Sequence, residues 1–189
     1  GACPDAADFG IKERFSNKIA VAPTASISII CGGTSPGIEP FAANSFTHKT
    51  LSGSFTVRNK QLLALLSSKG RDDDDIWSSI TAHEGSIQHL DFLSDDEKAV
   101  FKTAFEIDQR WLIELAADRT PYICQSQSLN LFLSADVHKR DLHKVHFNAW
   151  KKGLKSLYYC RSKSIQRADI VATMGSSVAA VSVPVLGRV

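Results

Sequence analysis

Two periods of apolar residues alternate along the chain, and they predict its elements. Short apolar runs bounded by turn residues favour buried strands, whereas apolar positions three and four apart favour amphipathic helices. Three short runs predict strands, at residues 19–22, 129–133 and 156–160. Because predicted helices separate these strands, the pattern indicates an α/β fold in which strands alternate with helices.

The predicted helices carry clear start and stop signals. Leucines face one side of residues 60–69, and Gly70 then ends that helix. Four aspartates, residues 72–75, begin the next helix because acidic side chains stabilise a helix N-terminus. Ser94 and Glu97 form a capping box, and apolar periodicity predicts one long helix from there to about residue 117. A last helix is expected over residues 141–154.

A β-hairpin is predicted between the first strand and these helices. Residues 46–49 and 54–58 flank Leu51-Ser52-Gly53, and glycine is favoured where a hairpin turns. We expect the hairpin to serve as scaffold.

Composition restricts the function. The chain has 189 residues, 43% of them apolar, which suffices for the core of one domain. Its 22 basic and 20 acidic residues include no basic block, so nucleic acid is not an expected partner. Cysteines 3, 31, 124 and 160 lack the short paired spacings of zinc sites or disulfide frameworks, which favours a reducing, cytoplasmic location.

The two ends differ from the central region. Residues 1–15 are expected to form an N-terminal extension with no secretory signal, and their start without Met suggests a cut or processed chain. Residues 166–189 are expected to form a flexible or docking tail. The stretch 170–187 lacks charge but is rich in Ser, Gly, Ala and Thr and contains Pro184, so we predict no membrane span.

The residues after the first strand are a candidate anion site. Pro23 ends the strand, and Thr24, Ala25, Ser26 and Ile27 begin a short helix. Backbone N–H groups at a helix start have no intrahelical acceptor, and with the helix dipole and the hydroxyls they favour an anion. The alternative is a simple N-cap.

Tyr158 and Tyr159 lie together in the apolar run 156–160. A buried phenol requires a hydrogen-bond partner, and alternation along a strand would direct the two rings to opposite faces. The pair therefore suggests redox chemistry, with a plain packing pair as the alternative. The aspartates 72–75 and the histidines 143 and 146 are better explained by helix capping and surface exposure, so no metal site is assigned.

Seven short motifs, taken in order, resemble the C-terminal third of a class I ribonucleotide reductase large subunit. They are Ala22-Pro23-Thr24-Ala25-Ser26-Ile27-Ser28, Gly37-Ile38-Glu39-Pro40, Leu51-Ser52-Gly53-Ser54-Phe55, Gly85-Ser86-Ile87-Gln88, Gln125-Ser126-Gln127-Ser128-Leu129-Asn130, Trp150-Lys151-Lys152-Gly153-Leu154-Lys155 and Tyr158-Tyr159. The resemblance covers residues 16–161, and we expect the reductase barrel portion to occupy residues 16–165.

This resemblance implies the closing part of a ten-stranded α/β barrel in an enzyme that reduces ribonucleoside diphosphates to deoxyribonucleotides. Pro23, Thr24, Ala25, Ser26 and Ile27 would bind the substrate diphosphate. Tyr158 and Tyr159 would relay the oxidising equivalent from the small subunit, the second tyrosine being oxidised first. No cofactor is implied in this chain, whereas a metal or radical cofactor is implied in the small subunit.

The parts absent from this sequence suggest a split large subunit. The radical cysteine, the reducing cysteine pair and the other barrel strands would precede residue 1, and no cysteine follows Cys160. The expected partners are thus the N-terminal part of the large subunit and a radical-generating small subunit, without which the chain would be inactive. The alternatives are a non-catalytic interaction module derived from the barrel and a free-standing phosphate-binding domain.

Overall fold

The computed structural model describes residues 2–50 and 53–162 of the chain, with the side chains of residues 48–50 excepted. The predicted tail, residues 166–189, and the hairpin residues Leu51 and Ser52 lie outside the described residues. The element order is mixed α/β, as the sequence predicts.

Three extended segments lie side by side in parallel. Strand β3 (Leu131–Leu133) pairs in parallel with β4 (Cys160–Ser162), with Leu131 opposite Cys160. On the other side, Val21 forms a parallel bridge with Gln127. The order across the sheet is therefore 19–21, 125–133, 158–162, as expected for consecutive strands of an α/β barrel.

Two of the three predicted strands are correct in place but not in extent, and the third is displaced. Residues 19–22 form only the bridge at Val21, because Pro23, two residues later, ends the pairing. The predicted strand 129–133 is regular from Leu131. The predicted strand 156–160 is displaced, since regular pairing begins at Cys160.

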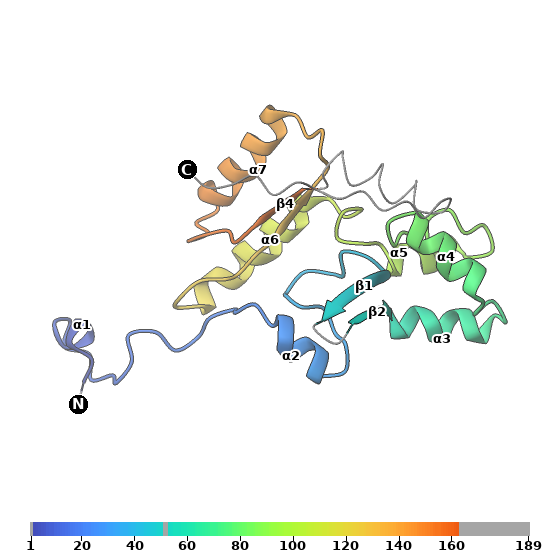
Figure 1. Cartoon of the computed structure of the whole chain (residues 1–189). Coiled ribbons are helices and arrows are strands. Elements are labelled where there is room, and N and C mark those ends of the chain that lie inside the picture. The colour runs from blue at the N-terminus through green and yellow to red at the C-terminus, as the bar shows by residue number, and fades with distance from the viewer. Residues whose placement is uncertain (1, 51–52, 163–189) are drawn as a thin grey trace, which may run out of the picture.

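Two helices cover one face of this sheet (Figure 1). Helix α6 (Gln109–Arg119) and helix α7 (Lys139–Lys151) contact each other. The buried side chains between helices and sheet are Leu112, Ala116 and Leu129 in one cluster and Ile113, Leu131 and Ala149 in another. Leu129 and Leu131 thus point to the helices, and by strand alternation Ser128 and Asn130 point to the opposite face.

The long helix expected over residues 94–117 is two helices, which corrects the prediction. Helix α5 (Asp95–Val100) begins with the predicted capping box of Ser94 and Glu97. The chain then leaves the helix, because the Ala104 N–H donates to the Phe41 carbonyl at 2.8 Å. Helix α6 restarts where the Asp108 side chain accepts the Arg110 N–H.

A second core lies beneath α3 (Lys60–Ser68) and α4 (Asp74–Ala82). It comprises Leu62, Leu66, Trp77, Ile80, Ile87, Leu90 and Leu93. Asn59 caps α3 and Asp73 caps α4, so the acidic start expected for the second helix is confirmed.

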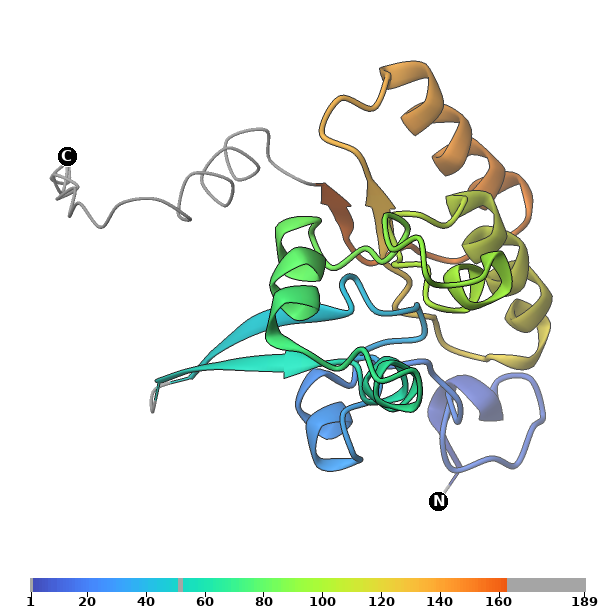
Figure 2. The same cartoon turned by 90° about the vertical axis from the view of Figure 1, so that its right-hand side faces the viewer.

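The hairpin is formed by β1 (Ser45–Thr50) and β2 (Gly53–Arg58), paired antiparallel with Thr50 opposite Gly53. Strands β1 and β2 extend away from the helices toward the left of Figure 2. Shorter elements are α1 (Pro4–Ala7), α2 (Ala25–Ile30) and the 3-10 turn η1 (Thr120–Tyr122). None of the helices in the described part of the chain is both long and apolar enough to span a bilayer.

Candidate functional site

The turn at Pro23 leaves the sheet at the carboxyl end of its first strand. Val21 accepts the Ser128 N–H at 2.8 Å and donates its own N–H to the Ser126 carbonyl at 3.0 Å. Four residues after Val21 the chain enters α2. In α/β folds, ligands bind at the carboxyl ends of the strands, which is where this turn lies.

The N-terminus of α2 is held from outside the helix. Thr24 occupies the N-cap position, but its side chain makes no capping hydrogen bond. Its backbone N–H instead donates to the Pro36 carbonyl at 3.0 Å. Thr24 therefore does not act as a side-chain N-cap, and the N–H groups of the first helical turn keep their capacity to bind an anion.

The five residues of the turn differ in exposure. Pro23, Ala25 and Ser26 are exposed, and Thr24 is half-buried. The Ile27 side chain is 57% exposed, although it is large and apolar. The turn thus presents backbone and small side chains, together with one apolar group that this chain does not cover.

An apolar cavity of about 280 Å³ lies between α2 and the hairpin. Its lining includes Ser28 and Ile29 of α2, Phe46 of β1 and Val57 of β2. The cavity borders the turn at Ala25, but polar groups that could bind a phosphate are scarce in it, so the cavity does not itself bind the anion.

Tyr158 and Tyr159 are attached to β3 by their backbones. The Tyr158 N–H donates to the Leu129 carbonyl at 2.8 Å, and the Leu131 N–H donates to the Tyr159 carbonyl at 2.8 Å. The pair therefore precedes β4 in the same hydrogen-bonded ladder. These bonds fix the backbone of both tyrosines beside the middle strand of the sheet.

The two tyrosine rings lie against each other. Their centroids are 4.2 Å apart, and the ring planes are tilted by 59°. A hydrogen bond to the Tyr159 phenol stabilises the protonated form of Tyr158 and raises the pKa of Tyr158. The Arg161 guanidinium lies 4.9 Å from the centre of the Tyr159 ring. Adjacent phenols joined in this way can exchange an electron and a proton over a short distance.

The expectation that the rings point to opposite faces is wrong. Alternation holds within a regular strand, but regular pairing begins only at Cys160, after both tyrosines. Both side chains are about half exposed, 47% for Tyr158 and 51% for Tyr159. Neither belongs to an apolar core of the described residues.

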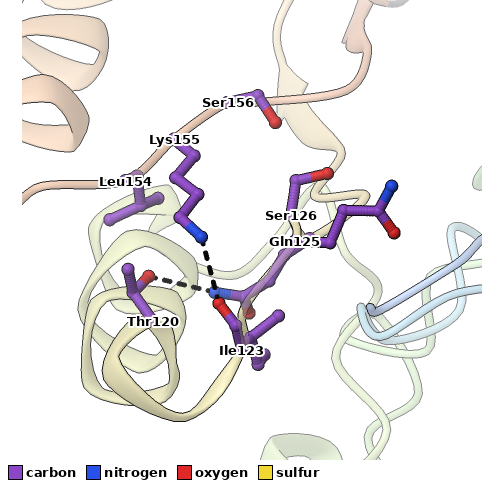
Figure 3. Close-up of a pocket in the computed structure, with 8 residues that line it drawn as sticks. Thr120, Ile123, Gln125, Ser126, Leu154, Lys155 and Ser156 are labelled. Carbon is purple, nitrogen blue, oxygen red and sulfur yellow. Dashed lines mark hydrogen bonds between the residues drawn. The ribbon is translucent and has the colours of Figure 1, made fainter. Parts of the chain in front are cut away.

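A small pocket lies at the opposite end of the strands (Figure 3). Lys155 extends across it and donates to the carbonyls of Ile123 at 3.3 Å and Cys124 at 2.6 Å. The pocket volume of about 10 Å³ admits roughly one water molecule. Lys155 therefore joins the segments that lead into β3 and β4, and the pocket is structural.

The remaining candidate chemical groups are the cysteines and the acidic and histidine side chains of the described residues. The four cysteines are free thiols. Two backbone N–H groups, of Lys18 at 2.9 Å and Ile19 at 3.1 Å, donate to the Cys124 sulfur and lower the pKa of that thiol. Within residues 2–50 and 53–162, no group of three or more His, Cys, Asp or Glu residues could hold a metal ion.

Two residues missed by sequence reasoning contact the middle strand. The Asn130 N–H donates to the Glu39 carboxylate, and the Phe132 N–H donates to the Gln109 side chain at 2.7 Å. Glu39 and Asn130 belong to two of the motifs that carry the family resemblance, but the sequence alone assigns neither residue a role. The spacing of 91 residues between them gave no local signal of the contact.

The site thus defines a segment of an α/β barrel, with a candidate anion turn on one strand and a tyrosine pair beside another. A family model described as "Ribonucleotide reductase, barrel domain" matches residues 6–160. The chain belongs to this family.

Two viral relatives agree with this assignment. The chain is 53% identical over 168 residues to the ribonucleoside-diphosphate reductase large subunit of Invertebrate iridescent virus 6, covering 87% of this chain and 18% of the relative. It is 48% identical to the large subunit of Invertebrate iridescent virus 3, covering 90% of this chain and 27% of the relative. The chain therefore spans only about a fifth to a quarter of these relatives.

A solved structure shares the fold. The alpha subunit of the Actinobacillus ureae class Id ribonucleotide reductase superposes with a TM-score of 0.73 at 39% identity, covering 87% of this chain and 29% of that one. The α/β barrel expectation is therefore confirmed for the fold family, while the described residues themselves form part of a barrel wall and no closed barrel.

Proposed function

We propose that this chain is a component of a ribonucleoside-diphosphate reductase large subunit. In this proposal, Pro23, Thr24, Ala25, Ser26 and Ile27 bind the substrate diphosphate, and Tyr158 and Tyr159 carry the oxidising equivalent toward the substrate. The observation that carries the proposal is the position of both groups on one parallel sheet. With neighbouring strands roughly 4.8 Å apart, the segments bearing them are separated by a single strand.

The chemistry divides between the two groups. The turn offers N–H groups and the positive end of a helix dipole to the diphosphate, and its small side chains permit close approach. The tyrosines offer two phenols in contact, each able to lose an electron together with its proton. No cofactor is assigned to this chain, and the radical originates in a small subunit that carries the metal or radical cofactor.

The partner that completes the active site is the N-terminal part of the large subunit. Two features of the described residues support this. Side chains Ile27, Ile29 and Ile30 of α2 are 57%, 59% and 85% exposed, an unusual apolar exposure for one short helix. Among the described residues, the buried atoms Ser128 Oγ and Asn130 Oδ1 have no hydrogen-bond partner, and both residues lie on the face of segment 125–133 that α6 and α7 do not cover.

Reconstitution tests this function. The chain is co-expressed with the polypeptide that carries the rest of the large subunit, a small subunit is added, and conversion of a ribonucleoside diphosphate to the deoxyribonucleotide is measured. We expect turnover only when all three are present. A complex that assembles fully but converts no substrate would contradict the proposal and favour an interaction module. A monodisperse isolated chain with no affinity for the rest would contradict the split arrangement.

A further inference from the structure

The edge of the middle strand that faces residues 19–21 loses its strand partner at Pro23. Along a parallel strand, alternate residues direct their N–H groups to the same edge. Ser128 uses this edge to pair with Val21, so the next N–H groups on it belong to Asn130 and Phe132. A buried N–H group without an acceptor is costly, so these two require other partners.

Two buried side chains accept these N–H groups in place of the strand partner that ends at Pro23. Glu39, 5% exposed, accepts the Asn130 N–H through Oε1. Gln109, 7% exposed, accepts the Phe132 N–H through Oε1 at 2.7 Å. The two acceptors make the same kind of contact two residues apart on one strand.

Gln109 and Glu39 differ in their other hydrogen bonds. Gln109 is the first residue of α6, and its amide donates to the carbonyls of Ala104 at 2.9 Å and Ile107 at 2.7 Å. Within the described part of the chain, Gln109 therefore connects the middle strand only to its own helix and the preceding loop.

Glu39, by contrast, connects the middle strand to the turn that precedes α2. Its backbone carbonyl accepts the Ser35 hydroxyl, and the adjacent Pro36 carbonyl accepts the Thr24 N–H at 3.0 Å. A short series of contacts thus runs from the middle strand to Glu39, from Glu39 to Ser35 and its neighbour Pro36, and from Pro36 to Thr24, the N-cap of α2.

Gly37 provides the space for the Glu39 carboxylate. A Cβ atom at residue 37 would lie 2.4 Å from Glu39 Oε2, well inside van der Waals contact. Among the described residues, no Lys, Arg or His nitrogen lies within 4.0 Å of this carboxylate. The carboxylate therefore serves as a hydrogen-bond acceptor for the strand and is not one half of an ion pair.

We propose that Glu39 is a positioning residue that fixes the turn at residues 23–27 against the middle strand, so that substrate diphosphate binds at a set position relative to the tyrosine pair. This inference rests on the proposed function. The tyrosines pair with the other edge of the strand, through Leu129 and Leu131, so loss of Glu39 leaves their backbone contacts in place.

The test compares four variants in the reductase assembled with the rest of the large subunit and the small subunit. Glu39→Leu removes the acceptor at similar volume, and we expect the KM for the nucleoside diphosphate to rise about tenfold while kcat stays within about twofold. Glu39→Gln retains an oxygen acceptor and should restore the wild-type KM. Gly37→Ala displaces the carboxylate and should raise KM as Glu39→Leu does.

Gln109→Leu is the matched control, because it removes the equivalent acceptor without touching the turn. A loss of folded complex lowers kcat in proportion to the inactive fraction and leaves KM unchanged, which is the result expected for Gln109→Leu. An equal rise in KM for both leucine variants, or a lower kcat at unchanged KM for Glu39→Leu, would overturn the proposal.

Amide hydrogen exchange separates this inference from the proposed function. In the same complexes, Glu39→Leu should accelerate exchange in peptides covering residues 24–36, and Gln109→Leu should not. If the wild-type complex shows no turnover, the proposed reductase function is contradicted. The exchange comparison still tests whether Glu39 fixes the turn. Unchanged exchange in Glu39→Leu overturns the link.

Discussion

Asn44, the residue before β1, joins the base of the hairpin to the helical part of the chain, and its replacement should loosen that part. The side chain is 3% exposed. Its Nδ2 donates to the carbonyls of Gly85 at 3.0 Å and Phe101 at 2.8 Å, and its Oδ1 accepts the Asn59 Nδ2 at 2.9 Å. One side chain therefore joins the end of α4, the end of α5 and the start of α3.

Asn44→Leu keeps a side chain of similar size and removes all three hydrogen bonds. At about 1 kcal/mol each, the local free energy of unfolding should fall by about 3 kcal/mol. The backbone bonds remain, from Asn44 N–H to Gly85 and from Asn59 N–H to Asn44. The loss should therefore loosen α3 and α4 without abolishing the fold.

Amide hydrogen exchange measures this effect, because exchange through local opening reports local stability. A loss of about 3 kcal/mol corresponds to roughly 100-fold faster exchange in peptides covering α3 and α4. Helix α7 belongs to a separate core and should be unaffected. Asn148→Leu, at an exposed position on α7, is the control and should change neither region. Acceleration below about tenfold, or an equal acceleration in α7, would refute the reasoning.

Two further predictions concern pH and the substrate turn. Burial and the stacked ring of His83, 3.7 Å away, lower the pKa of His89, so the folded state binds fewer protons than the unfolded state. The free energy of unfolding should then be greatest above the unfolded pKa of about 6.5 and should fall as pH decreases through the lower pKa of the folded state. Thermal unfolding midpoints measured between about pH 7.5 and pH 5 test this. The same decline in a His89→Gln variant would contradict it. Ala25→Asp places a negative charge at the proposed diphosphate site and should weaken substrate binding in the assembled enzyme while radical formation in the small subunit continues. The exposed Ala82→Asp is its control, and unchanged substrate affinity of the Ala25 variant would contradict the assignment.

Local signals in the sequence were sufficient for the hairpin and for the starts of α3, α4 and α5. Gly53 lies opposite Thr50 in the observed register, as a glycine turn predicts. The capping box at Ser94 and the acidic start of α4 were found because the residues that form a cap lie within one helical turn of each other.

Long-range contacts explain what the sequence did not show. The break between α5 and α6 depends on the hydrogen bond from Ala104 to Phe41, more than 60 residues away, while apolar periodicity continues across it. The Glu39 contact with Asn130 depends on where Pro23 ends a strand on the neighbouring edge. The tyrosine rings meet because the ladder becomes regular only after them, and strand periodicity cannot reveal that.

The radical relay through Tyr158 and Tyr159 is the central claim, and turnover of phenylalanine variants tests it most directly. Phenylalanine keeps the ring, which remains about half exposed, but removes the phenol that releases a proton with its electron. In the reconstituted enzyme, Tyr158→Phe and Tyr159→Phe should each abolish deoxyribonucleotide formation, with complex assembly and substrate affinity close to wild type. Near-full turnover in either variant would show that this tyrosine does not carry the radical.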